Sequence, residues 1–283
     1  WVISILTTYR DVEGECKYIG GVFEVRYAGE LKNIIDPRFS IALQKPAKDD
    51  IMEFTHILGK LLVLAKGNVR LVYHLLYALY EPVFYDIVGS KYGVFVGSVA
   101  DTRAPTHTVF DHAYATASMV NLVYSTGEER VSGKSVKDRL DGYIVIVDLA
   151  GVQKFISASR KLRDLWLSSW LASALAWATI WPLVYALGPD IMVKPSPRNN
   201  PFYYSSLLAV LKSKASNVGD IENYFAKSVG PINKDIPRFG VMPTQIILVL
   251  PRFSIIVQSL REVVEEKILP ENVEKTIKNS IAT

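Results

Sequence analysis

The stretch YIVIVDLAGVQKFISASRKLRDLWLSSWLASALAWATIWPLVYAL, residues 143–187, decides the fold of the chain. It opens with a run of β-branched residues, which predicts a strand. Residues 165–187 then continue for 23 positions without a charged side chain and predict one long helix. Gly188 and Pro189 end that helix, and DIMVKPSP, residues 190–197, predicts a second, short strand. The pattern is a strand, helix, strand unit.

A further strand and helix follow later in the chain. TQIILVLP, residues 244–251, predicts a strand, and FSIIVQSLREVVEEKI, residues 253–268, has apolar side chains at helical spacing. The order strand, helix, strand, strand, helix is most of a ferredoxin-like βαββαβ unit without its last strand. We therefore predict an α+β fold, with a ferredoxin-like domain over residues 143–283 that is incomplete at the C terminus.

Helical periodicity dominates the sequence before this domain. Apolar side chains recur every three or four positions between residues 49 and 88, where Gly67–Asn68 and Glu81–Pro82 predict helix ends. The polar stretch VADTRAPTHT, residues 99–108, predicts a turn. Residues 110–125, FDHAYATASMVNLVYS, predict another helix.

The predicted domains are separated by a linker. Residues 125–142 are charged and contain Gly and Ser, which is typical of a surface segment. Residues 1–50 contain two β-like stretches, VISILTT and GVFEVRYA. We therefore predict a mainly helical region over residues 1–124, a linker over 125–142 and a second domain over 143–283.

The composition excludes several protein classes. Of the 283 residues, 49% are hydrophobic and 21% are charged, as in ordinary globular proteins, which excludes wholesale disorder and collagen. A single cysteine, Cys16, excludes an internal disulfide, and with no N-terminal signal pattern it favours a reducing cytoplasm. The net charge of +4 permits contact with nucleic acid without arguing for it. Because the first residue is Trp1, we expect a piece of a longer protein.

The uncharged segment, residues 165–187, is also long enough to span a membrane. Its four tryptophans, at positions 166, 170, 177 and 181, fall within roughly a 60° arc of a helix and form one stripe. Tryptophans that anchor a helix in lipid gather at the two interfaces, whereas a continuous stripe favours packing against a neighbouring element such as a sheet. We therefore predict a buried helix, with a membrane-attached protein as the alternative.

The sequence lacks a Walker loop and the motifs GxGxxG, HExxH, GxSxG and CxxC, which excludes the enzyme families that these short motifs define. The adjacent pair Asp111 and His112 has two interpretations. One is a metal-dependent phosphohydrolase that uses the pair with His107 and further ligands. The other, which the isolated doublet favours, is that the pair caps or stabilises the helix start or binds a partner.

Two polar clusters are candidate ligand sites. The first follows the strand that ends at Asp148, and its cations and hydroxyls either bind phosphate or form a solvated helix start. It consists of Lys154, Ser157, Ser159, Arg160, Lys161, Arg163 and Asp164. The second is the loop KPSPRNNPFYY, residues 194–204, which either stacks on a base or ribose or is an ordinary surface loop. Its polar residues are Lys194, Arg198, Asn199, Asn200 and Tyr203.

Two stretches together resemble the large, polymerase- and cyclase-like subunit of type III-B CRISPR effector complexes, the Cmr group. VADTRAPTHTVFDHAYATASM, residues 99–119, is similar to that family's ADTR, Pro, His, DH and TA pattern. DLAGVQKFISASRKLRDLWLSSWLASAL, residues 148–175, looks like its signature for the start of the first palm domain. The resemblance is close over about 50 residues, and the order of elements extends it more loosely over residues 49–268.

The resemblance implies a function in antiviral defence. Such subunits lie at the foot of a crRNA-guided ribonucleoprotein, and on recognising target RNA their two palm domains bind ATP and make cyclic oligoadenylate. Many members also carry an HD domain that cuts single-stranded DNA. The implied partners are the other Cmr subunits, crRNA and target RNA in the cytoplasm, with no membrane. The implied cofactor is ATP, shared with a second palm that would also supply any divalent metal.

The chain departs from the family pattern in its catalytic motifs. It has no GGDD, no paired cysteines for a zinc-binding insertion, and no HD motif followed by prolines near its N terminus. The resemblance therefore assigns no catalytic or metal-binding residue to this chain, which is expected to be part of a cyclase or a split subunit with a scaffolding role. It does imply contacts with ATP. The implied residues are Lys161 and Arg163 near the phosphates, Ser168 or Ser169 beside them, and Asn200 near the sugar or base.

Overall fold

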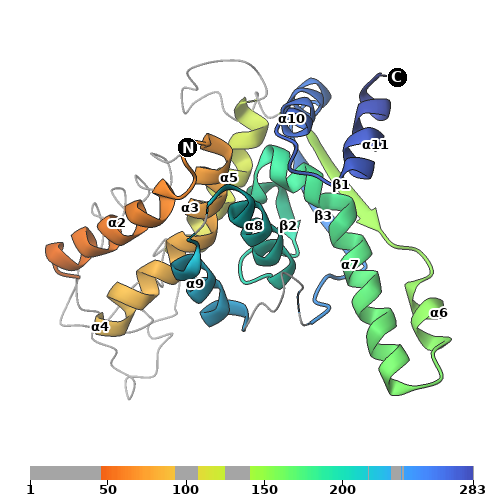
Figure 1. Ribbon diagram of the computed structural model, residues 1–283, viewed down its shortest axis with the longest axis horizontal. Coiled ribbons are helices and arrows are strands. Elements are labelled where there is room, and N and C mark those ends of the chain that lie inside the picture. The colour runs from red at the N-terminus through yellow and green to blue at the C-terminus, as the bar shows by residue number, and fades with distance from the viewer. Residues whose placement is uncertain are drawn as a thin grey trace, which may run out of the picture. The chain divides into compact units, whose positions relative to one another are not determined.

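The computed structural model describes residues 46–92, 108–124, 141–215, 217–230, 237 and 239–282. The β-like stretches predicted near the N terminus, the predicted turn up to His107 and most of the predicted linker lie outside these residues. The described part is mostly helical and contains a small three-stranded antiparallel sheet (Figure 1). This combination confirms the predicted α+β class.

The chain forms two compact units. One consists of residues up to Leu62 together with Leu79–Ala117, and the other consists of Val63–Ala78 and Ser118–Thr283. The three divisions between the units, after Leu62, Ala78 and Ala117, all fall inside helices, so three helices contribute residues to both units. The domain boundary predicted at 125–142 lies mostly outside the described residues and stays a prediction.

Aromatic side chains form the core of the first unit. Helix α2 (Lys48–Val63) buries Phe54, and the second half of α3 (Val69–Phe84) adds Tyr80 and Phe84. The ring of Phe84 lies 5.6 Å from that of Phe54 and 5.2 Å from that of Phe110, both edge to face. Phe110 belongs to α5 (Val109–Tyr124), which confirms the helix predicted at 110–125.

One of the two helix ends predicted in this region is correct. The chain turns before Asn68, whose side-chain oxygen accepts a hydrogen bond from the backbone N–H of Leu71 at 2.9 Å and so caps α3. The end predicted at Glu81–Pro82 is wrong, because α3 runs through Pro82. A π-helical turn (Tyr85–Gly89) and α4 (Ser90–Tyr92) continue it.

The second unit contains the three predicted strands and the two helices predicted at 165–187 and 253–268, in the order expected. In chain order its remaining elements are β1 (Tyr143–Asp148), α6 (Val152–Ser157), α7 (Leu162–Leu187), a 3-10 turn (Pro189–Ile191), β2 (Met192–Lys194), α8 (Pro201–Lys214), α9 (Gly219–Val229), β3 (Gln245–Leu250), α10 (Phe253–Glu265) and α11 (Glu271–Ala282). The short helix α6 was not predicted as a separate element. Gly188 ends α7 as predicted, with a φ of 113°.

The strands lie in the order β1, β3, β2, and both outer strands are antiparallel to β3. β1 and β2 are therefore parallel to each other, joined by a crossover that contains α7. Alternate residues of β3, Ile246, Leu248 and Leu250, are buried on one face of the sheet. The opposite, open face carries Ile144 and Ile146 of β1, which pair with Val249 and Ile247 of β3.

The tryptophan stripe of α7 packs largely against helices. The ring of Trp170 lies 6.2 Å from Phe202 of α8, and that of Trp177 lies 6.3 Å from Tyr203. Trp177 is buried and also donates a hydrogen bond to the Ser206 hydroxyl at 2.8 Å. We expected a sheet beneath the stripe, whereas these aromatic partners belong to α8. The prediction of burial is confirmed for Trp177 and wrong for Trp166, which is 52% exposed.

Helix α7 is longer than the sheet that it accompanies. Its 26 residues extend about 39 Å at ~1.5 Å per residue. The six residues of β3 extend only about 20 Å. The first half of α7 therefore runs past the ends of the strands, with α6 beside it (Figure 1). This length difference explains why Trp166 is exposed although it lies on the helix face that is buried further along.

Candidate functional site

Four cations surround the junction of α6 and α7. Lys154 lies in α6, Arg160 and Lys161 lie in the connection, and Arg163 lies in the first turn of α7; all four are exposed. Arg163 approaches one carboxylate, that of Asp164, at 3.9 Å with both side chains largely in solvent. Such a pair contributes little stability, so these charges are available to an anionic ligand.

The connection between the two helices is held by a pair of serines. The hydroxyls of Ser159 and Ser168 lie 3.1 Å apart and share a hydrogen bond. Ser168 is therefore already engaged in joining the connection to the second turn of α7. Lys161, with extended backbone angles, is the residue that precedes the helix. The hydrogen bond fixes Arg160 and Lys161 next to the helix start.

A loop crosses the middle of α7 beside Ser169. A side chain at Gly240 would meet the backbone of Trp170 at 2.9 Å and the carbonyl oxygen of Ser169 at 3.3 Å, so glycine permits this close approach. The hydroxyl of Ser173 donates a hydrogen bond to the backbone oxygen of Met242 at 3.2 Å. The loop therefore lies along the face of α7 that contains Ser169 and Ser173.

Asn200 lies on the other side of this loop and is buried, with 3% of its surface exposed. Its side-chain oxygen accepts a hydrogen bond from the backbone N–H of Phe202 at 3.0 Å and caps α8. Its amide nitrogen lies 3.4 Å from the sulfur of Met242. The side chain is thus engaged in the fold, and its predicted contact with a sugar or base stays a prediction.

The five residues that the sequence implicated do not converge on one point. Lys161 and Arg163 lie together at the start of α7, whereas Ser169 lies six residues beyond Arg163, or roughly 9 Å along the helix. Asn200 is separated from the surface by the loop around Met242. The structure groups the cations and leaves the serines as a second position further along the same helix.

The end of the proposed base-binding loop, residues 200–204, is part of the core, whereas Lys194 and Asn199 are exposed. Tyr203 is fully buried, and its hydroxyl lies 3.0 Å from Nδ1 of His74. The interpretation that Tyr203 stacks on a ligand at the surface is therefore wrong. Burial lowers the pKa of His74 to about 4, so this imidazole is neutral at physiological pH.

Asp111 forms a helix cap, as the sequence favoured. Its carboxylate accepts hydrogen bonds from the backbone N–H and the hydroxyl of Thr108, at 2.9 and 2.7 Å. In return the Thr108 hydroxyl accepts from the backbone N–H of Asp111 at 3.0 Å, which completes a reciprocal cap. His112 is exposed, and His107 lies outside the described residues. Within those residues no three His, Cys, Asp or Glu side chains are arranged for a metal ion.

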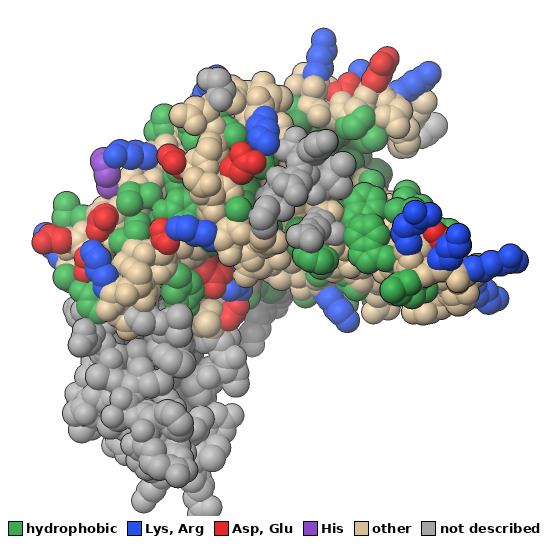
Figure 2. Space-filling view, turned by 60° about the horizontal axis from the view of Figure 1, so that its bottom comes forward, with side chains coloured by type: hydrophobic (Ala, Val, Ile, Leu, Met, Phe, Trp, Pro, Cys, Tyr) green, Lys and Arg blue, Asp and Glu red, His purple; other side chains and the backbone are tan. Residues whose placement is uncertain are grey.

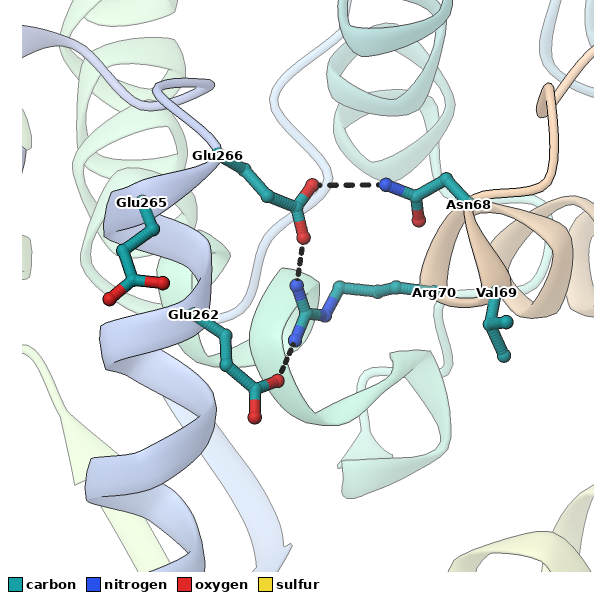
Figure 3. A pocket seen from close by; sticks show the side chains of 6 residues that line it. All are labelled: Asn68, Val69, Arg70, Glu262, Glu265 and Glu266. Carbon is teal, nitrogen blue, oxygen red and sulfur yellow. Dashed lines mark hydrogen bonds and ion pairs between the residues drawn. The ribbon is translucent and has the colours of Figure 1, made fainter.

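A charged pocket in the second unit was not predicted from the sequence (Figure 3). Arg70 of α3 binds Glu262 of α10 at 2.8 Å and also pairs with Glu266. Glu266 further accepts hydrogen bonds from Asn68 at 3.1 Å and from the Tyr185 hydroxyl at 3.2 Å. These carboxylates are already paired, so the pocket holds helices together and is not a free ligand site. Residues almost 200 positions apart meet here, and only the spacing of Glu262 and Glu266 along one helix face could have suggested it.

A second buried polar group, Asp190, follows the end of α7. Its carboxylate accepts a hydrogen bond from the side-chain amide of Asn121 at 2.6 Å. Only 3% of Asp190 is exposed, and this burial raises its pKa to about 7. Asp190 and His74 are both buried, and their hydrogen-bond partners include Asn121, Tyr185 and Tyr203, so both belong to the core.

Residues 144–283 match the family described as CRISPR-associated protein Cmr2, N-terminal. These residues belong to the Cmr2 family. The chain is 39% identical over 191 residues to the CMR subunit Cmr2 of Saccharolobus solfataricus, a match that covers 64% of this chain and 17% of that relative. It is 32% identical over 126 residues to Cmr2 of Pyrococcus furiosus, covering 44% of this chain and 12% of that one.

A solved structure shows the same arrangement. The chain matches one described as type III-B Cmr-beta in the apo state, determined by cryo-EM, with a TM-score of 0.62 and 34% identity. The match covers 77% of this chain and 22% of that one, so the chain spans less than a quarter of each of these Cmr2-type relatives and of the solved chain. The resemblance to the large Cmr subunit is therefore confirmed for its N-terminal part.

Helix α7 is long and apolar enough to cross a membrane by length and composition, and half of its most apolar window is buried inside the protein. A span surrounded by lipid would have its apolar side chains facing outward. Burial against α8 and the loop at Met242 instead favours a core helix, as the tryptophan stripe predicted.

Proposed function

We propose that the chain acts as the N-terminal part of the large subunit of a type III-B Cmr complex, a crRNA-guided antiviral ribonucleoprotein. In this role residues 143–283 form a ferredoxin-like palm domain. That palm provides half of an ATP-binding cleft used for cyclic oligoadenylate synthesis, and surfaces for neighbouring Cmr subunits, crRNA and target RNA in the cytoplasm. Membership of the Cmr2 family supports the assignment to a Cmr complex, and the antiparallel sheet supports the assignment of a palm domain.

The open face of the sheet is the observation that carries this proposal. Ile144 and Ile146 are 75% and 59% exposed, and Val193 of β2 is 53% exposed. Between the outer strands lie Ile247 and Val249, so the centre of the open face is apolar. The exposed polar residues of this face, Asp148, Gln245 and Lys194, lie toward the strand ends. An antiparallel sheet that faces water normally alternates apolar and polar residues. This face is therefore suited to contact with a second domain.

The exposed cations fit the phosphates of ATP. Lys161 and Arg163 are positively charged, lie in one turn and lack a strong carboxylate partner among the residues that the structure describes. They would hold the triphosphate, while Ser169 would offer a hydroxyl further along α7. The described residues contain no cluster of carboxylates for a metal. Divalent metal would accordingly be held by the second palm, and ATP would supply the adenylate units.

Reconstitution tests the proposal. The chain is co-expressed with the remainder of a Cmr2-type subunit, the other Cmr subunits and guide RNA, and target RNA and ATP are then added. We expect co-purification and oligoadenylate. Replacing Ile144 and Ile146 by lysine should abolish both, because two charges on the open face prevent contact with an apolar partner. The matched control places lysines at Met52 and Val63, which are 59% and 74% exposed on α2.

Two results would contradict the proposal. One is a monodisperse chain that never associates with Cmr subunits. The other is a stoichiometric transition metal in the purified chain together with DNA cleavage that is lost in His112→Ala, which would favour the metal-dependent phosphohydrolase. The structure gives that alternative less support than the sequence did, because Asp111 already caps α5.

A further inference from the structure

We infer that the arm formed by α6, the connection and the first two turns of α7, residues 152–168, binds single-stranded nucleic acid. The inference deepens the proposed function and rests on it only for the source of the strand. It concerns more of the surface than the proposed ATP contacts. Lys154, Arg160, Phe155 and Trp166 lie outside those contacts.

The charge of the arm is the first argument. Four cations and one carboxylate, Asp164, lie within residues 152–168 among otherwise uncharged side chains. Lys and Arg side chains gather at the end of the molecule formed by α6 and the start of α7 in Figure 2. A triphosphate is compact, whereas the phosphates of a strand are spaced along it and use cations on both helices. Phosphate contacts of this kind supply most of the affinity of sequence-independent binding.

The exposed rings are the second argument. Phe155 of α6 is 50% exposed, and Trp166 of α7 is 52% exposed. Trp166 lies three residues after Arg163 and four after Leu162, so these three side chains occupy neighbouring positions on one side of the helix. Proteins that bind single strands combine a cationic track with aromatic rings on which bases stack.

The rigidity of the arm is the third argument. The shared hydrogen bond between Ser159 and Ser168 joins the connection to α7, and the backbone N–H of Ala158 closes α6 on the carbonyl of Lys154 at 3.2 Å. The cations of the two helices are thereby held on one ordered scaffold. An apolar protein surface would complement only the exposed apolar side chains of the arm. The cations that lie between these side chains favour a polyanion as the ligand.

Binding of a fluorescent 12-nucleotide single-stranded RNA to the full chain tests the inference by anisotropy at several salt concentrations. We expect Lys154→Ala with Arg160→Ala to weaken binding by roughly tenfold and to reduce the slope of log K against log salt by about 1.4, at ~0.7 per lost phosphate contact. The control, Lys275→Ala with Lys278→Ala on α11, removes the same charge from exposed positions and should leave binding unchanged.

The role of Trp166 has its own readout. Fluorescence quenching by the strand should fall in Trp166→Phe, which retains a ring, and affinity should fall further in Trp166→Ala. The inference would be overturned if the unaltered chain did not bind the RNA. It would also be overturned if the arm variant, Lys154→Ala with Arg160→Ala, and the control variant, Lys275→Ala with Lys278→Ala, lost affinity equally.

Competitors identify the source of the strand. Unlabelled oligoadenylate that competes more than tenfold better than a mixed-sequence RNA points to a product strand, and equal competition points to guide or target RNA. Reconstituted complexes separate the two proposals. Oligoadenylate synthesis without strand binding by the arm refutes this inference alone, whereas strand binding in a chain that never joins a Cmr complex refutes only the proposed function.

Discussion

Two buried ionisable residues, His74 and Asp190, have opposite effects on how the free energy of unfolding changes with pH. His74 has a pKa of about 4 in the folded protein, against an ordinary value of 6.5. Asp190 has a pKa of about 7, against 3.8. Burial is the main cause of both shifts, since it disfavours the charged form of each group. The folded state therefore binds fewer protons than the unfolded state at His74 and more at Asp190.

These shifts predict opposite pH dependences. Between about pH 4 and 6.5 the unfolded state holds the extra proton at His74, so this residue makes stability rise with pH. Between about pH 4 and 7 the folded state holds the extra proton at Asp190, so this residue makes stability fall as pH rises. We expect the unaltered protein to show little net slope between pH 4.5 and 6. The free energy of unfolding of the Asp190→Asn variant should then rise with pH, and that of the His74→Gln variant should fall.

Urea unfolding at several pH values checks this prediction. Tryptophan fluorescence reports on the second unit, because the four tryptophans of α7 all lie there. The comparison concerns slopes and not absolute stability, since both substitutions also remove core hydrogen bonds. Parallel pH profiles in the two variants would show that neither group has a perturbed pKa.

At the scale of elements, the packing of α3 against α10 depends on Arg70. Its side chain is only 16% exposed and pairs with Glu262 and Glu266. Arg70→Ala leaves Glu266, which is 22% exposed, with the more distant Lys214 at 3.6 Å as its remaining cation. We expect a loss of about 1–3 kcal/mol in the free energy of unfolding, between the values for exposed and buried pairs.

Urea unfolding followed by far-UV circular dichroism, which reports on the helices of both units, measures this loss. Lys91→Ala is the matched control, because Lys91 also pairs with two carboxylates, Asp50 and Glu53, but lies at the surface of the first unit. No measurable change is expected there. Equal effects of the two substitutions would mean that burial of the Arg70 network contributes nothing.

Periodicity predicted most elements of the second unit because local patterns encode them. The strands at 143–148 and 245–250, the end of α7 at Gly188 and the helix at 253–265 all agree with the sequence. The passage of α3 through Pro82 was missed, since buried neighbours at Val83 and Phe84 override the local preference of proline. The partners of the tryptophans were also missed, because they depend on where α8 packs.

In the candidate site, too, the sequence predicted local features and missed those that depend on distant contacts. The sequence predicted the exposed cations Lys161 and Arg163, because a run of basic residues with few acidic neighbours can be read directly from the order of the residues. It could not predict that Asn200 is buried and caps α8, or that Gly240 brings a loop against α7. Both facts depend on contacts between segments that are far apart in the sequence.

At the scale of the whole molecule, the apolar helix predicts how the chain behaves in solution. Half of its most apolar window is buried among protein side chains. We therefore expect the purified chain to stay in the supernatant after high-speed centrifugation without detergent. Recovery only in detergent, with α7 protected from proteolysis by lipid vesicles, would support the membrane-attached alternative instead.

The length of α7 also constrains how relatives can differ by insertion and deletion. Residues before Ser173 project from a helix whose later turns are fixed in the core, so removing two residues between Trp166 and Ser173 would rotate Arg163 and Trp166 by about 200° to the opposite side. Adding seven residues there would rotate them by only about 20° and lengthen the arm by about 10 Å. Length variation in this segment should therefore occur in steps of seven, or of three to four, residues.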